Sequence, residues 1–137
     1  MTDKTAAGGT VPERSSATIL LVDDETDILP EYQEFLELAG FTALTESGSE
    51  QAVRTVTERA DIGVVVTDLR MAKLDGASLI RTLQTSLPAE RRLQFIVLTG
   101  DATSLARSNE CDAPVLLKPV DFDALINALD SALMARR

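Results

Sequence analysis

The chain has 137 residues, of which 45% are hydrophobic and 26% are charged, as in an ordinary soluble domain that can bury a core. Its net charge of −9 disfavours direct binding to nucleic acid or to an anionic membrane, because the phosphate groups would repel the surface. The absence of histidine excludes imidazole metal ligands and general bases, and the single cysteine excludes an internal disulfide.

Residues 1–17 are small and polar, and they predict a flexible leader before a folded domain over 18–137. No apolar run is long enough to span a bilayer, and the start of the chain lacks the apolar core of a signal peptide. These features, with the low cysteine content, predict a cytoplasmic protein.

Short runs rich in β-forming residues recur along the chain, at 19–22, 42–45, 63–67, 95–98 and 115–117. Three of these runs are continuously apolar, which is typical of strands that are buried on both faces of a parallel sheet.

Segments with helical spacing lie between these runs: 27 to about 39, 47 to about 59, one that ends before Pro88, about 102–109, and one that starts after Asp121. Gly40 is placed to end the first helix, and Asp121 is placed to cap the last. Ser47 and Glu50 form a capping-box pattern for the second. Regular alternation of strand and helix predicts a doubly wound α/β fold with helices on both faces of the sheet.

Polar residues follow four of the predicted strands. Asp23 and Asp24 follow the first strand, and Asp68 follows the third. Thr99 follows the fourth strand, and Lys118 follows the fifth. Because ligands bind beyond the carboxyl ends of the strands in such folds, we expect these side chains to share one site.

The residue types at this edge favour phosphoryl transfer. Carboxylates crowded together repel one another unless a cation neutralises them, and oxygen ligands without histidine favour Mg²⁺ or Mn²⁺. Lys118 and the hydroxyl of Thr99 suit an incoming anion. Asp68, at the end of the central strand, is the best-placed nucleophile, since carboxylates are known acceptors of phosphoryl groups.

Four segments together resemble the receiver domains of bacterial two-component response regulators: LLVDDE at 20–25, VTDLRM at 66–71, VLTG at 97–100 and LKP at 117–119. The resemblance covers about residues 18–135. It implies the CheY-like, flavodoxin-like fold, with a five-stranded parallel sheet in the order 2-1-3-4-5 and five helices. It is compatible with a receiver that stands alone and with the receiver part of a longer regulator.

The resemblance also implies a metal site. Asp24 resembles the direct Mg²⁺ ligand, and Asp23 resembles the ligand that often acts through water. Asp68 and the backbone carbonyl of Arg70 complete the implied set of metal ligands.

The same resemblance assigns the phosphoryl chemistry. Asp68 resembles the residue that accepts the phosphoryl group, Thr99 the switch hydroxyl and Lys118 the cation that pairs with the phosphate. The Lys118–Pro119 peptide bond resembles one that is cis in the family, although most bonds before proline are trans.

The implied partners are proteins. A sensor histidine kinase or a histidine phosphotransfer protein would supply the phosphoryl group. A downstream protein target or effector domain would read a face formed by the helix near 102–109, the strand at 115–117 and the last helix. Phosphorylation-dependent homodimerisation through the last helix is a further expectation from the family.

Two other functions compete with this interpretation. An aspartate-nucleophile phosphatase would carry a second acid two residues after the nucleophile, where this chain has Arg70. An interaction module that is never phosphorylated would lack part of the acidic cluster, which this chain retains. Val115 stands where the family often has an aromatic residue, and this departure keeps the interaction module as the alternative.

Overall fold

The computed structural model describes residues 17–71, 75–100 and 113–136. Within these ranges five strands form a single sheet: β1 (Thr18–Val22), β2 (Thr42–Glu46), β3 (Ile62–Asp68), β4 (Gln94–Thr99) and β5 (Val115–Leu117). Their order is β2-β1-β3-β4-β5, and every neighbouring pair is parallel. The predicted order 2-1-3-4-5 is therefore confirmed.

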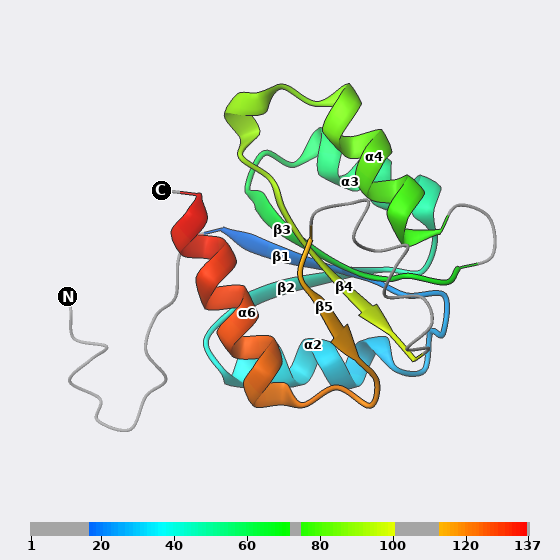
Figure 1. Cartoon of the computed structure of the whole chain (residues 1–137), viewed down its shortest axis with the longest axis vertical. Coiled ribbons are helices and arrows are strands. Elements are labelled where there is room, and N and C mark those ends of the chain that lie inside the picture. Colours follow the sequence, from blue (N-terminus) through cyan, green and yellow to red (C-terminus); the bar gives the residue numbers. More distant parts are fainter. Residues whose placement is uncertain (1–16, 72–74, 101–112, 137) are drawn as a thin grey trace.

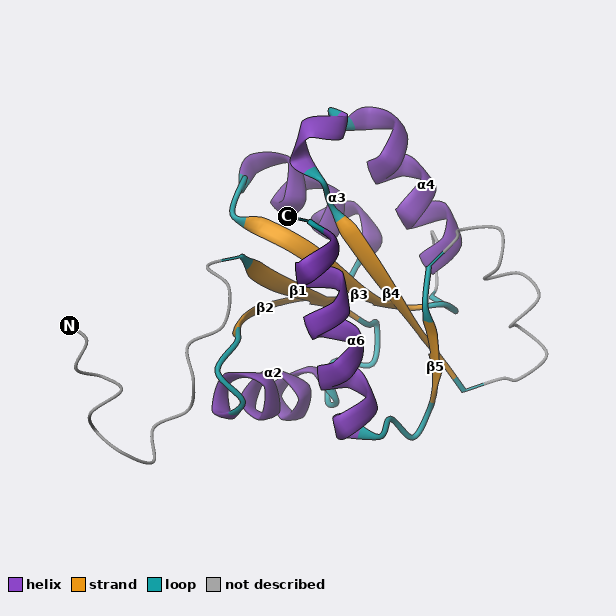
Figure 2. Ribbon diagram, turned by 60° about the vertical axis from the view of Figure 1, so that its left-hand side comes forward, coloured by secondary structure: helices purple, strands orange, loops and turns teal. Residues whose placement is uncertain are grey.

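Helices cover both faces of this sheet, as predicted. They are α2 (Leu29–Leu38), α3 (Ser49–Glu58), α4 (Gly76–Ser86) and α6 (Phe122–Ala135), with a short 3₁₀ helix, η1 (Ala89–Arg91), between α4 and β4. Figures 1 and 2 show α3 and α4 on one face and α2 and α6 on the other. The helix predicted near 102–109 lies outside the described residues, as do residues 1–16 of the predicted leader.

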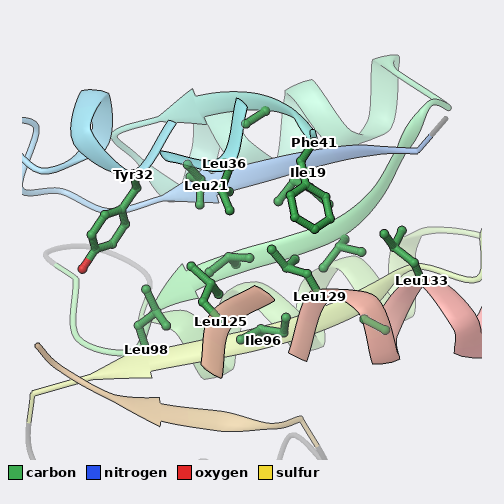
Figure 3. Packing of buried hydrophobic residues seen from close by; sticks show 14 of the residues in the cluster. Ile19, Leu21, Tyr32, Leu36, Phe41, Ile96, Leu98, Leu125, Leu129 and Leu133 are labelled. Carbon is green, nitrogen blue, oxygen red and sulfur yellow. The ribbon is translucent and has the colours of Figure 1, made fainter. Parts of the chain in front are cut away.

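Two apolar clusters form the core, one on each face of the sheet. Ile19 and Leu21 of β1 point into the cluster beneath α2 and α6, which also contains Leu36 and Leu125 (Figure 3). Leu20 points into the cluster beneath α3 and α4. Side chains alternate between the faces of a strand, so β1, which is apolar from Ile19 to Val22, is buried on both sides as predicted. The same prediction is wrong for the apolar run 115–117, because β5 is an edge strand that is only partly buried and exposes Leu117.

The helix boundaries agree with most of the local signals. Gly40, with a φ of 101°, follows the end of α2 in a conformation that favours glycine. The side chain of Asp121 accepts a hydrogen bond of 3.0 Å from the Asp123 N–H at the start of α6, which confirms the predicted cap. The predicted capping box is wrong, because Gly48 is the N-cap of α3 and makes no side-chain hydrogen bond. Ser47 therefore lies one residue before the helix boundary.

The start of α4 is tightly joined to the end of β3. Asp75 caps the helix by accepting a 2.9 Å hydrogen bond from the Ser78 N–H. The Gly76 N–H donates to the Leu69 carbonyl at 2.8 Å. A Cβ atom at position 76 would lie only 2.5 Å from the backbone oxygen of Asp68, so this approach requires glycine.

Arginine side chains join the chain at the opposite edge of the sheet. Arg136 Nε donates to the Arg92 carbonyl at 3.0 Å, and Arg92 Nη1 donates to the Arg136 carbonyl at 3.2 Å. Arg91 Nη2 donates to the Arg59 carbonyl at 3.0 Å. We call Arg91, Arg92 and Arg136 the arginine clamp. It fastens the end of α6 and the β3 side of the sheet to the η1 segment.

None of the helices in the described ranges has both the length and the apolar character needed to cross a bilayer.

Candidate phosphorylation site

The carboxyl ends of four strands meet at one edge of the sheet, as the sequence predicts. Asp23 follows β1, Asp68 ends β3, Thr99 ends β4 and Lys118 follows β5. Backbone hydrogen bonds continue the sheet to these positions, because the Lys118 N–H donates to the Thr99 carbonyl at 2.8 Å. The site is thus fixed by the sheet itself and not by the side chains alone.

Three carboxylates converge at this edge. Asp23, Asp24 and Asp68 each offer an oxygen, and these oxygens all lie within 4.8 Å of one another. Asp23 and Asp68 are buried and Asp24 is exposed, so the cluster has one side open to solvent. Close carboxylates with a solvent-facing side fit a small hard cation such as Mg²⁺, which retains several water ligands when bound.

Lys118 joins two of these carboxylates. Its Nζ atom lies 3.0 Å from Asp23 Oδ2 and 3.2 Å from Asp68 Oδ1. Burial lowers the pKa of Lys118, but the hydrogen bonds and charges of Asp23 and Asp68 outweigh burial, and the pKa is raised overall. The ammonium group therefore stays charged and can pair with another anion.

Asp68 combines burial with access. Only 8% of the residue is exposed, and burial raises the pKa of its carboxyl group, with the Lys118 charge opposing and the Asp23 charge reinforcing this shift. It also lines an open pocket of about 330 Å³ together with Glu25, Arg70, Gly100 and Lys118. A small group can thus reach Asp68 from solvent through a pocket that two cationic side chains and one other carboxylate line.

Asp23 is held at both carboxylate oxygens. Its Oδ1 accepts a 2.9 Å hydrogen bond from the Glu25 N–H, and its Oδ2 accepts from Lys118. Because both oxygens have protein partners, a cation can reach this side chain most readily through bridging water.

The structure places the predicted residues as follows. Thr99 is fully buried at the end of β4, and Arg70 lines the pocket of Asp68. The Lys118–Pro119 bond is cis, which confirms that prediction. The role of the Arg70 carbonyl as a metal ligand stays a prediction.

Sequence reasoning gave no role to two neighbours of the site. Glu25 Oε1 lies 3.9 Å from Lys118 Nζ, and only its place beside Asp24 could have indicated this. Tyr32 is buried on α2, where its hydroxyl is subject to the charges of Lys118 and Asp23. Its helical spacing with Phe35 predicts only a core position.

Comparison with known proteins identifies the family of this chain. A family model for the response regulator receiver domain matches residues 19–130. The transcriptional regulatory protein GlrR of Escherichia coli is 32% identical over 120 residues, which cover 85% of this chain and 26% of that protein. The chain spans about a quarter to a third of the length of the curated relatives it matches.

Solved structures give the same result. A response regulator receiver domain protein from Clostridium thermocellum is 34% identical, with a TM-score of 0.76 over 85% of this chain and 94% of that chain. A response regulator receiver protein from Pseudomonas putida is 30% identical, with a TM-score of 0.77 over 86% of this chain and 98% of that chain.

The fold and the acidic edge of the sheet are those of a receiver domain. The chain belongs to the response regulator receiver domain family, and its sheet is that of the CheY-like fold.

Proposed function

We propose that this receiver accepts a phosphoryl group on Asp68 from the phosphohistidine of a sensor histidine kinase or histidine phosphotransfer protein. The observation that carries the proposal is the position of Asp68. It lies in an open pocket, 3.2 Å from the Lys118 ammonium and within a cluster of converging carboxylates.

A carboxylate oxygen of Asp68 attacks the phosphorus as the phosphorus–nitrogen bond breaks. The electron pair of that bond stays on the partner's imidazole, which leaves as the neutral ring because its second nitrogen carries a proton. The product on this chain is an acyl phosphate. Lys118 Nζ, now close to Asp68 Oδ1, exchanges part of that contact for the new phosphoryl oxygens. The Thr99 hydroxyl donates to another phosphoryl oxygen after a change at the end of β4.

Asp23, Asp24, Asp68 and the Arg70 carbonyl would hold Mg²⁺ or Mn²⁺ in this proposal, and their oxygen donor set fits such an ion. When bound, the ion neutralises charge on the transferring phosphoryl group. Without the metal ion, the ammonium group of Lys118 neutralises part of the charge of Asp23 and Asp68.

The switch follows from added charge. The phosphoryl group adds about −1.5 to −2 charges, and reversing a two-state equilibrium from 1:99 to 99:1 needs about 5.5 kcal/mol of differential interaction. New contacts with Lys118 and Thr99 contribute to that difference. We propose that β5 and α6 then present a changed face to a protein target, an effector domain or a second copy of the chain.

Intact-mass measurement tests the chemistry. The protein is incubated with acetyl phosphate, with and without Mg²⁺, as wild type, Asp68→Ala and Asp123→Ala. Asp123 is an exposed carboxylate on α6 and serves as the matched control. We expect a Mg²⁺-dependent gain of one phosphoryl group in wild type and in Asp123→Ala, and none in Asp68→Ala.

Two results would contradict the proposal. A gain that persists in Asp68→Ala would place the phosphoryl group elsewhere. No gain in wild type, together with no response to beryllofluoride, would favour an interaction module that is never phosphorylated.

A further inference from the structure

An aromatic cluster joins α2 to the start of α6. The rings of Phe35 and Phe122 are stacked, with centroids 3.9 Å apart and an interplanar angle of 20°. The ring of Tyr32 meets Phe122 edge-on, at 5.7 Å and 88°. The whole chain has four phenylalanines, one tyrosine and no tryptophan, so three of its five aromatic side chains meet here. Stacked and edge-to-face pairs of this kind stabilise packing beyond the area that they bury.

The cluster lies beside the segment that carries Lys118. Phe122 follows Lys118 by four residues, and Val120 between them packs against the same core cluster as Tyr32. Asp121 caps α6, and the Lys118 N–H is bonded to the Thr99 carbonyl. The β5–α6 connection is therefore short and held at both ends, and the packing of Phe122 constrains where the Lys118 backbone lies.

The charges of the site also act on Tyr32. It is 6% exposed, and Figure 3 shows its hydroxyl at the Leu98 end of the cluster, pointing away from the other labelled side chains. Burial raises the pKa of Tyr32, while the charge of Lys118 lowers it and those of Asp23 and Asp68 raise it. The hydroxyl therefore lies within the electrostatic range of the groups that rearrange when the site is loaded.

We propose that Tyr32 is a positioning residue for Lys118, which acts by packing against Phe122, and that loading of the site changes the surroundings of the Tyr32 ring. This inference rests on the proposed function, since it concerns the residue that pairs with the phosphoryl group. Helix α2, which carries Tyr32, would thus help to position the Lys118 ammonium group, which follows β5.

The rate of phosphoryl uptake separates this role from core packing in general. Tyr32→Leu removes the ring, Tyr32→Phe keeps it, and Phe41→Leu removes a ring from the same core cluster at its other end (Figure 3). Rates of uptake from acetyl phosphate are measured at a temperature at which circular dichroism shows every variant to be folded. We expect Tyr32→Leu to be slower by about fivefold, since small displacements of a reacting group have large kinetic effects. Tyr32→Phe and Phe41→Leu should stay within about twofold of wild type.

Fluorescence gives an independent readout. Because the chain has one tyrosine and no tryptophan, its intrinsic emission arises from Tyr32 alone. Titration with beryllofluoride and Mg²⁺ should change this emission saturably in wild type and leave it unchanged in Asp68→Ala.

The outcomes are distinct. If wild type takes up no phosphoryl group, the proposed function fails and this inference fails with it. If wild type reacts but Tyr32→Leu is no slower than Phe41→Leu, only the inference is overturned. An equal loss of uptake rate in Tyr32→Phe and Tyr32→Leu also overturns the inference. So does a wild-type emission that beryllofluoride does not change.

Discussion

Replacing Gly76 by alanine tests how closely α4 is built against the phosphorylation site. An alanine at a helix position normally stabilises a protein relative to glycine, by up to about 1 kcal/mol. Here the added Cβ would lie 2.5 Å from the Asp68 oxygen and 3.0 Å from Leu69 Cα. Both neighbours are backbone atoms, so no side-chain rotation can relieve the contact.

The magnitude follows from what would have to move. An ordinary contact would need α4 and the end of β3 to separate by about 1 Å, against the Gly76–Leu69 hydrogen bond of 2.8 Å and the Asp75 cap. Overpacking of this kind costs about 1–3 kcal/mol. We expect a net loss of about 2 kcal/mol, or about 8 °C in Tm for a domain of this size.

Urea unfolding followed by circular dichroism measures this loss. Gly100→Ala is the matched control, because a Cβ at position 100 meets no atom of the described residues within 4 Å, and its stability should stay within about 0.5 kcal/mol of wild type. Because the clash involves the backbone of Asp68, Gly76→Ala should also slow phosphoryl uptake. Equal stability of Gly76→Ala and wild type would show that α4 can shift freely, and the reasoning would be wrong.

Two further predictions concern charge. Lys118→Met should lower the free energy of unfolding by about 2 kcal/mol in metal-free buffer, because Asp23 is left buried without its cation. In thermal unfolding, Mg²⁺ should stabilise this variant more than it stabilises wild type. Equal effects of Mg²⁺ on the two proteins would contradict this prediction. Hydrogen bonds from Arg59 and Thr18 lower the pKa of Asp61 from 3.8 to about 2. The contribution of the ionised Asp61 carboxylate to the free energy of unfolding is therefore complete above about pH 4 and is lost as the pH falls through about 2. Wild type should therefore be more stable than Asp61→Asn by under about 1 kcal/mol at pH 6, and by less at pH 3. A difference that does not change with pH would show that the Asp61 carboxylate is not the cause.

The sequence predicts the sheet and the acidic edge well because both depend on simple patterns. Continuously apolar runs indicate strands buried on both faces, and the runs in β1 and β4 are buried at every position. The rule fails for β5, because an edge strand has a neighbour on one side only. Once the strands are parallel, the residues after them must meet at one edge, which is how Asp23, Asp68 and Lys118 come together.

Features that depend on distances between elements could not be predicted in this way. Ser47 and Glu50 have the spacing of a capping box, but the backbone conformation places the helix boundary at Gly48. The approach of Gly76 to Asp68 and the contact of Tyr32 with Phe122 depend on the packing of segments far apart in sequence. Local patterns contain no information on such separations.

The arginine clamp has a consequence for how movement spreads through this domain. Its guanidinium groups donate hydrogen bonds to backbone carbonyls at the end of α6, at the end of η1 and just after α3. We therefore expect these contacts to persist when a metal ion or a phosphoryl group is bound at the opposite edge. The clamped edge of the sheet would stay fixed, and a displacement that starts at Lys118 would reach β5 and the first turns of α6.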